Sequence, residues 1–267
     1  MKEQPAIVLL TDFGYTDVYA GLLKAVIYSI SPSAPVLDLT HGIEPQNILR
    51  AAFVLENSYQ FYPQGTIFVC VVDPGVGTGR KILCVKTSRY YFIAPDNGVL
   101  SRVLEREKIV EIRHIENPKF YISQAPSKTF HGRDIMAPAA AHLVRTQGRV
   151  FKKLGPRASQ TTRYNIPKVK KTKNEVEGQI LYFDYYGNAI TNVSLNDIPQ
   201  SQRKNASVIV KKIKLGPIQT TYGNEKQKKL RALFNSFSML EIALPRGSAK
   251  KFAALKIEDP VLIRLSA

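Results

Sequence analysis

Apolar and polar positions along residues 1–165 predict strands and helices in turn. Short apolar runs predict strands, and longer runs with apolar residues every three or four positions predict helices. Strands are expected at Ala6–Leu10, Pro35–Leu39, Thr66–Val72, Ile82–Thr87, Tyr90–Ala94 and Ile109–Ile112, and helices at Val18–Ser29, Gln46–Ser58 and Gly132–Thr146. Because strands that alternate with helices form layered α/β units, we predict an α/β domain with a mostly parallel central sheet and helices on its faces.

The pattern changes after Gly148. Glycine, proline and a lysine-rich stretch, Lys168–Lys173, predict a linker. Beyond it we find no convincing helical pattern, and short β-rich runs separated by turns follow at Glu177–Phe183, Ala189–Val193, Ser207–Lys212, Ile218–Thr221, Leu230–Phe234, Met239–Leu244 and Pro260–Leu265. We therefore expect two domains: an α/β domain at residues 1–165 and a smaller all-β domain, a barrel or sandwich, at residues 166–267.

Composition narrows the class of protein. More than half of the net charge of +17 lies in residues 166–267, largely as lysine runs without an RNA-binding aromatic signature, so solvated lysines are favoured over a nucleic-acid face. The apolar run Ala6–Leu10 is too short to cross a membrane, and we expect a cytoplasmic protein with no membrane partner. Cys70 and Cys84 lie inside apolar runs and are expected to be buried, reduced thiols.

Carboxylates follow two of the expected strands. Asp73 comes directly after Thr66–Val72 and precedes one proline and three glycines within six residues, and Asp12 follows the first strand. Carboxyl ends of strands in an open α/β sheet are where ligands bind. Arg80 ends the glycine-rich stretch after Asp73, and His131 stands much further along the chain at the start of a helical pattern. We predict that Asp73, Arg80 and His131 converge on one pocket and form the chemical site. Asp12 is suited to accept hydrogen bonds from a ribose diol, although an Asx turn that only caps the next helix is the alternative.

The histidines leave several roles open. His131 can be a base, an orienting group or the cap of the helix that follows it, and His41 either lines the site or is structural. No His, Cys and carboxylate set has zinc-like spacing, so no metal is expected. Phosphate-binding glycine motifs and the G-x-S-x-G nucleophile motif are absent as well.

Three polar turns in the second half carry candidate binding groups. The turn Asp184–Asn188 combines a carboxylate, two tyrosines and an amide, which can hold an amine and stack against a flat base, or can simply close a hairpin. The turns Asn235–Ser238 and Arg246–Ala249 expose backbone groups that can read an adenine edge or be plain loops.

Taken together, these motifs resemble the S-adenosyl-L-methionine (SAM) hydroxide adenosyltransferases, which are relatives of the bacterial fluorinase and chlorinase. The resemblance runs in order over nearly the whole chain, and its most specific blocks are Asp73–Gly77 and Phe130–Asp134. The matching segments are Thr11–Gly14, Val72–Thr78, Pro95–Gly98, Phe130–Asp134, Asp184–Asn188 and Leu240–Ala243. The resemblance agrees with the two-domain organisation.

The resemblance implies that water splits SAM at the ribose C5′ atom to give adenosine and L-methionine. SAM is then the substrate, and no cofactor or metal is implied. By matching motifs, the family's roles fall as follows: Asp73, Arg80 and His131 orient the water, Asp12 binds the ribose, Thr78 lies near C5′, Asp184 holds the methionine amine, Asn188 helps at the adenosyl end, Ser236 meets the methionine carboxylate, and the backbone at Ser248 and Ala249 reads adenine. The family also implies a homotrimer whose sites lie between the N-terminal domain of one subunit and the C-terminal domain of its neighbour.

Two other functions compete with hydrolysis. In a SAM-dependent halogenase, a halide replaces the hydroxide. The presence of both Arg80 and His131 favours water, because the resemblance implies that the halogenating relatives lack this pair. A non-catalytic SAM- or nucleoside-binding protein, or a basic RNA-associated protein, is the alternative from a different class.

Overall fold

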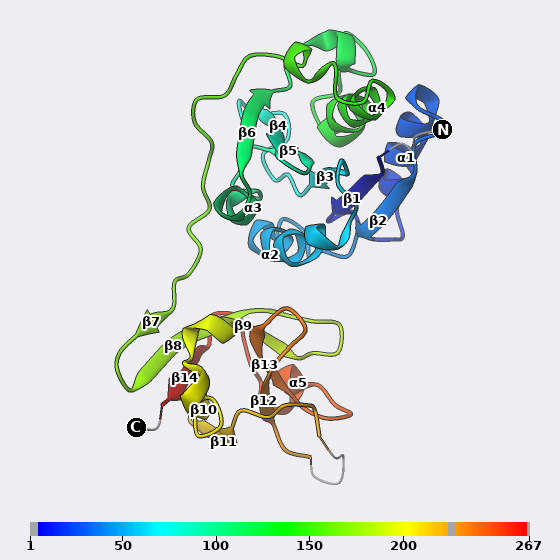
Figure 1. The fold of residues 1–267 in the computed structure, drawn as a ribbon. Coiled ribbons are helices and arrows are strands. Elements are labelled where there is room, and N and C mark those ends of the chain that lie inside the picture. The colour runs from blue at the N-terminus through cyan, green and yellow to red at the C-terminus, as the bar shows by residue number, and fades with distance from the viewer. Residues whose placement is uncertain (1–4, 224–227, 266–267) are drawn as a thin grey trace. The chain divides into compact units, whose positions relative to one another are not determined.

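The computed structural model describes residues 5–223 and 228–265 and divides the chain into two compact units, Met1–Tyr164 and Asn165–Ala267 (Figure 1). The first unit contains a six-stranded sheet in the order β2-β1-β3-β5-β4-β6. Its strands are β1 (Ile7–Thr11), β2 (Val36–Thr40), β3 (Ile67–Val71), β4 (Ile82–Thr87), β5 (Tyr91–Pro95) and β6 (Ile109–His114). β1 is parallel to β2 and β3, and β3 to β5, whereas β4 is antiparallel to both of its neighbours, β5 and β6. The predicted mostly parallel α/β sheet is confirmed.

Helices cover both faces of this sheet (Figure 1). They are α1 (Tyr19–Ile30), α2 (Ile48–Ser58), α3 (Ser101–Arg106) and α4 (Ala137–Arg145). Because successive side chains of a strand point to opposite faces, β1 supplies two separate cores. Ile7 and Leu9 pack in the core that contains buried residues of α1 and α4, and Val8 and Leu10 pack in the core that contains buried residues of α2 and α3.

The second unit is built from antiparallel strand pairs, which confirms the predicted all-β class. Its strands are β7 (Lys170–Lys171), β8 (Glu175–Phe183), β9 (Ala189–Ser194), β10 (Ser207–Val210), β11 (Ile213–Pro217), β12 (Arg231–Phe234), β13 (Met239–Ala243) and β14 (Pro260–Arg264). They follow the order β11-β10-β14-β8-β9-β13-β12, with β7 beside β8. A bridge between Gln219, just after β11, and Leu233 on β12 brings the two ends of the sheet together and gives it a nearly closed, barrel-like form.

In the second unit, two sequence-based expectations differ from the structure. The expected strand Ile218–Thr221 is wrong, because Lys211 and Lys212 adopt left-handed backbone angles that turn the chain straight after β10, so the next strand is β11. A four-residue helix, α5 (Ala249–Phe252), lies where no helix was expected, and the side chain of Ser248 caps it by accepting from the backbone N–H of Lys251. Such a short helix has too few turns to leave a periodic signal.

Both cysteines are free and fully buried, as expected, and burial raises the pKa of each thiol well above its usual range. None of the helices in the described ranges is long and apolar enough to cross a membrane.

Candidate functional site

The register of two neighbouring strands brings the predicted carboxylates together. β1 and β3 are parallel, and Thr11 at the end of β1 pairs with Val71 at the end of β3. Asp12 and Asp73 therefore leave the sheet at the same edge. Both line a cavity of about 320 Å³ whose walls also include Phe13, Gln46, Phe130 and His131. Phe13 and Phe130 pack edge to face, with ring centroids 5.6 Å apart, and form an apolar wall.

Arg80 connects the other two members of the predicted set. Its Nε atom donates to Asp73 Oδ1 (2.8 Å), and its Nη2 atom donates to Asp73 Oδ2 and lies 2.8 Å from His131 Nδ1. The Asp73 side chain is 7% exposed and the Arg80 side chain 10% exposed. Arg80 therefore lies behind the two residues that face the cavity and fixes both of them. The structure brings all three predicted residues together.

Two glycines make this close approach possible. Gly77 has a left-handed backbone (φ 78°), and a Cβ atom there would lie 2.3 Å from the carbonyl oxygen of Lys128, so the loop after Asp73 packs tightly on the segment before His131. A Cβ atom on Gly132 would lie 2.9 Å from Val71 Cγ1, so the chain after His131 packs directly on the end of β3.

The predicted helix Gly132–Thr146 begins differently from the expectation. Gly132–Met136 forms a π-helical turn before α4, and His131 stands at its N-terminal end. π-helical turns occur frequently at functional sites. Asp134, which is 2% exposed, accepts hydrogen bonds from the backbone N–H of Ser127 and from Arg133, so the segment that carries His131 is tied down on both sides.

Burial and neighbouring charges shift two pKa values at this cavity. Burial lowers the pKa of His131 and the positive charge of Arg80 lowers it further, while Asp73 offsets part of that effect. Burial raises the pKa of Asp12, and the nearby Asp73 adds to this, although the backbone N–H of Gln46 donates to Asp12 Oδ2 (2.7 Å) and opposes the rise. His131 is therefore neutral at pH 7. On the same cavity, the hydrogen bond from the Gln46 backbone N–H partly supports the ionised form of Asp12.

Gln46 is a residue that the sequence analysis missed. It adopts a left-handed backbone conformation (φ 66°), unusual for a residue other than glycine, and this conformation accompanies the N–H bond to Asp12. Nothing in the local sequence marks it, because the contact joins residues 34 positions apart. Thr78 lies outside the residues that line the cavity, and its hydroxyl donates to the carbonyl of Gly75 (2.7 Å), which stabilises the loop that leads to Arg80.

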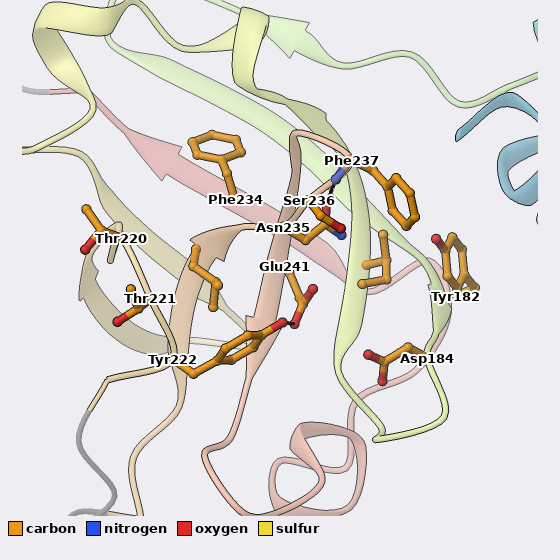
Figure 2. Close-up of a pocket in the computed structure, with 12 residues that line it drawn as sticks. Tyr182, Asp184, Thr220, Thr221, Tyr222, Phe234, Asn235, Ser236, Phe237 and Glu241 are labelled. Carbon is orange, nitrogen blue, oxygen red and sulfur yellow. Dashed lines mark hydrogen bonds between the residues drawn. The ribbon is translucent and has the colours of Figure 1, made fainter. Parts of the chain in front are cut away.

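The second unit contains its own cavity of about 510 Å³ (Figure 2). Asp184 and Ser236, two predicted binding residues, both line it. In Figure 2, Tyr222 points toward Glu241, and its hydroxyl donates to Glu241 Oε1 (3.0 Å). Burial raises the pKa of Glu241, and the charge of Asp184 raises it further, against the hydrogen bond from Tyr222. Burial, together with the same contact, raises the pKa of Tyr222 to about 12.

Glu241 and Tyr222 were also missed by the sequence analysis. Glu241 is 3% exposed in the middle of the apolar strand β13. A charged residue inside an otherwise apolar strand was the available signal, because such a side chain needs partners or faces a cavity. Tyr222 offers no comparable signal, since a tyrosine beside a glycine is ordinary loop sequence.

The remaining predicted residues lie together on another part of the second unit. Asp184 accepts from the backbone and side chain of Asn188 (2.8 and 2.9 Å), which closes the turn between β8 and β9. The turn packs on the start of α5: Ser248 leaves no room for a Cβ atom on Gly187, and the N–H of Lys250 donates to the Gly187 carbonyl (2.9 Å). Asn188, Ser248 and the fully buried Ala249 are therefore neighbours, although they lie outside the residues that line the 510 Å³ cavity.

Over the described residues, no group of three or more His, Cys, Asp and Glu side chains is arranged to hold a metal ion.

Comparison with known proteins adds independent information. The sequence model of the SAM hydroxide adenosyltransferase N-terminal domain matches residues 7–155, and that of the C-terminal domain matches residues 178–262. A (R)-S-adenosyl-L-methionine hydrolase from Thermus thermophilus is 33% identical over 96% of this chain and 98% of its own length. A fluorinase from Actinoplanes sp. is 26% identical over 74% of each chain. The crystal structure of an uncharacterized conserved protein from Thermotoga maritima superposes with a TM-score of 0.88 at 36% identity, over 96% of this chain and 99% of that one.

Proposed function

This chain belongs to the SAM hydroxide adenosyltransferase family, and we propose that it hydrolyses SAM to adenosine and L-methionine at the cavity lined by Asp12, Asp73 and His131. The observation that carries the proposal is the contact of Arg80 with both Asp73 and His131 at the edge of that cavity. The reaction forms a bond between the water oxygen and C5′ and breaks the bond between C5′ and sulfur. Methionine leaves as a neutral thioether, and one proton from the water is released.

In this reaction the water, rather than the leaving group, needs activation. A sulfonium needs no protonation to leave, whereas water is a weak nucleophile with a pKa near 15.7 in bulk. We assign Asp73 to align the water and accept its proton. His131 donates a hydrogen bond to the oxygen as hydroxide character develops on it, and the positive charge of Arg80 behind His131 and Asp73 adds electrostatic stabilisation.

The contact with Arg80 determines which nitrogen of His131 carries the proton. A guanidinium is always protonated and only donates, so Nδ1 of His131 accepts and Nε2 carries the hydrogen. The lowered pKa of His131 is consistent with this neutral form. His131 is therefore assigned as a hydrogen-bond donor to the nucleophile or its neighbours, and Asp73 is the remaining base.

The two ends of SAM are assigned to different groups. Asp12 binds the ribose hydroxyls, which is supported by its place on the same cavity as Asp73. We further propose that Asp184 and Ser236, which share the second cavity, bind the methionine amine and carboxylate. Thr78 near C5′, and Asn188, Ser248 and Ala249 at the adenosyl end, are carried over from the family resemblance.

We also propose, from the family resemblance, that the protein is a homotrimer and that residues 1–165 and 166–267 act as its two domains. From the sequence we propose a cytoplasmic location, which cell fractionation tests. The Thermus relative is named for the R epimer of SAM, and we propose the same preference for this chain. Assays with separated epimers at the sulfonium test that preference.

Halogenation is the second candidate, because a fluorinase is among the relatives. The Arg80–His131 contact supports the choice of water, since it leaves the Nε2–H of His131 able to donate to a hydroxide. The decisive experiment incubates purified protein with SAM in ¹⁸O-labelled water, with and without chloride. Hydrolysis predicts adenosine and methionine, with the label in the adenosine 5′-hydroxyl. Formation of 5′-chloro-5′-deoxyadenosine as the main product would assign the halogenase activity instead, and binding without turnover would leave a SAM-binding protein.

A further inference from the structure

A chain of polar contacts runs from the surface of the first unit to the buried end of β1. Lys24 Nζ lies 2.6 Å from Asp38 Oδ2, and the other Asp38 oxygen lies 3.0 Å from His41 Nε2, an electrostatic contact rather than an aligned hydrogen bond. His41 Nδ1 lies 2.8 Å from Thr11 Oγ1, and the backbone N–H of Phe13 donates to the same oxygen (3.2 Å). Four side chains and one backbone group are thus linked in series.

The direction of these contacts follows from their chemistry. The carboxylate of Asp38 favours a proton on His41 Nε2, which leaves Nδ1 as the acceptor. Thr11 then donates its hydroxyl hydrogen to His41 and accepts from Phe13 N–H. Thr11 is 0% exposed and His41 is 1% exposed, so this contact is made in the protein interior, where an unmatched polar group is costly.

The series resembles a nucleophile, histidine and carboxylate set in composition, but burial excludes that role. Thr11 is fully buried, neither Thr11 nor His41 lines the cavity, and the threonine hydroxyl already holds a backbone N–H. The contacts of Thr11 and His41 therefore act on the conformation of the surrounding backbone rather than on a substrate.

The chain around Thr11 is the turn that carries Asp12. Phe13, whose N–H is held by Thr11, follows Asp12 directly, and the N–H of Gly14 donates to the carbonyl oxygen of His41 (2.8 Å). His41 therefore contacts the turn through its ring and through its backbone, on both sides of Asp12. A third contact from the same segment, Gln46 N–H to Asp12, reaches the carboxylate itself.

We propose that His41 is a positioning residue: through Thr11 it fixes the turn so that the Asp12 carboxylate faces the ribose. This rests on the proposed binding of the SAM ribose by Asp12. Asp12 directly follows β1, so a shift of this turn would move its carboxylate and misalign both of its oxygens toward the two ribose hydroxyls. His41 thereby acts on substrate affinity without touching the substrate.

Paired substitutions separate this role from general stability. An Asn side chain places its oxygen near the position of Nδ1 and can still accept from Thr11, whereas Gln places its amide nearer Nε2 and cannot. Likewise, Thr11→Ser keeps the hydroxyl that Thr11→Val removes. The measurements are KM and kcat for SAM hydrolysis, and the dissociation constant for adenosine by calorimetry, in wild type and in Thr11→Val, Thr11→Ser, His41→Gln and His41→Asn. Thermal unfolding verifies that each variant is folded.

We expect Thr11→Val and His41→Gln to weaken adenosine binding and to raise KM by about tenfold, which is the effect expected from the loss of one hydrogen bond. The kcat of each variant should stay within about threefold of wild type. Thr11→Ser and His41→Asn are expected to stay close to wild type. In an Asp12→Ala background, Thr11→Val is expected to add no further loss of adenosine affinity, because its effect passes through Asp12.

Three results would overturn the inference: unchanged adenosine affinity in both disrupting variants, equal losses in His41→Gln and His41→Asn, or a full additional loss in the Asp12→Ala background. If Thr11→Val does not fold, the comparison of His41→Gln with His41→Asn decides. Failure of the proposed function is distinguishable, because the wild-type protein would then not hydrolyse SAM at all.

Discussion

Replacing Arg80 with alanine should lower kcat for SAM hydrolysis far more than it raises KM. Arg80 makes two hydrogen bonds to Asp73 and one to His131, and neither Arg80 nor Asp73 is more than one-tenth exposed. The variant removes a preorganised cation and leaves His131 without the donor that sets its tautomer. Removal of one such group typically costs about 10²- to 10³-fold in kcat, or roughly 2.7–4 kcal/mol in the transition state.

The substitution should also change the pH dependence. Arg80 lowers the pKa of His131, whereas Asp73 raises it. Without Arg80, the His131 pKa rises, so the loss of activity on acidification should begin at a higher pH than in wild type. A purely structural role of Arg80 would not shift that limb.

The stability cost should be moderate. Breaking a fully buried ion pair costs about 3–5 kcal/mol, but Asp73 lines a cavity where solvent can compensate, so we expect about 1–3 kcal/mol. Arg80→Lys keeps the charge but lacks the planar fork that reaches both partners, and an intermediate loss of kcat is expected.

Arg102→Ala is the matched control. It removes a guanidinium from the ion pair with Glu56, a carboxylate of the same unit that is 1% exposed. Glu56 keeps Arg106 as a second partner, and neither Arg102 nor Glu56 lines the cavity. It should lower the melting temperature and leave kcat unchanged. The assay follows adenosine formation by chromatography over a range of SAM concentrations that reaches saturation, which yields kcat and KM separately. If Arg80→Ala keeps kcat within about threefold of wild type, or only raises KM, the assigned role is wrong.

Three further predictions follow from the structure. Because the pKa of His131 is lowered from its ordinary value, activity should be full at pH 7 and fall as the pH drops through that lowered pKa, and His131→Asn should abolish this limb of the kcat profile. Gly132→Ala forces a Cβ atom to 2.9 Å from a β3 side chain, so it should lower the free energy of unfolding by about 1–3 kcal/mol and also reduce kcat. Gly21→Ala in α1 has open space around it and should raise the free energy of unfolding by about 0.5–1 kcal/mol. Equal effects of the two substitutions in thermal unfolding would contradict the packing argument. If the site is shared between subunits, mixing the inactive variants Asp73→Ala and Asp184→Ala should regain activity by complementation, and no gain despite verified subunit exchange would refute a shared site.

The sequence determined the class of each half of the chain because the hydrophobic period is a local property. Alternation of strands and helices in the first half predicted the mostly parallel sheet, and short apolar runs in the second half predicted its all-β character. The error at Ile218–Thr221 has a local origin too. Lys211 and Lys212 adopt backbone angles that are rare for lysine, and composition gives no warning of them.

The sequence also located part of the site. Asp12 and Asp73 follow strands, and the rule that ligands bind at the carboxyl ends of parallel strands placed them at one edge, where the structure has them on one cavity. The motif around His131 suggested a histidine for that site, but sequence alone left its role open between base, orienting group and helix cap.

Only the tertiary structure decided which groups act on one another. Arg80 and His131 are 51 residues apart, and their contact, which assigns the proton on His131, depends on how the Asp73 loop packs against the Lys128 backbone. The contacts of His41 with Thr11 and of Gln46 with Asp12 join residues 30 and 34 positions apart. A hydrogen bond requires positions accurate to tenths of an ångström, and these are set by the packing of the whole unit. The local pattern of apolar and polar residues therefore determines the helices and strands, whereas the packing of the core determines which of their side chains come within hydrogen-bonding distance.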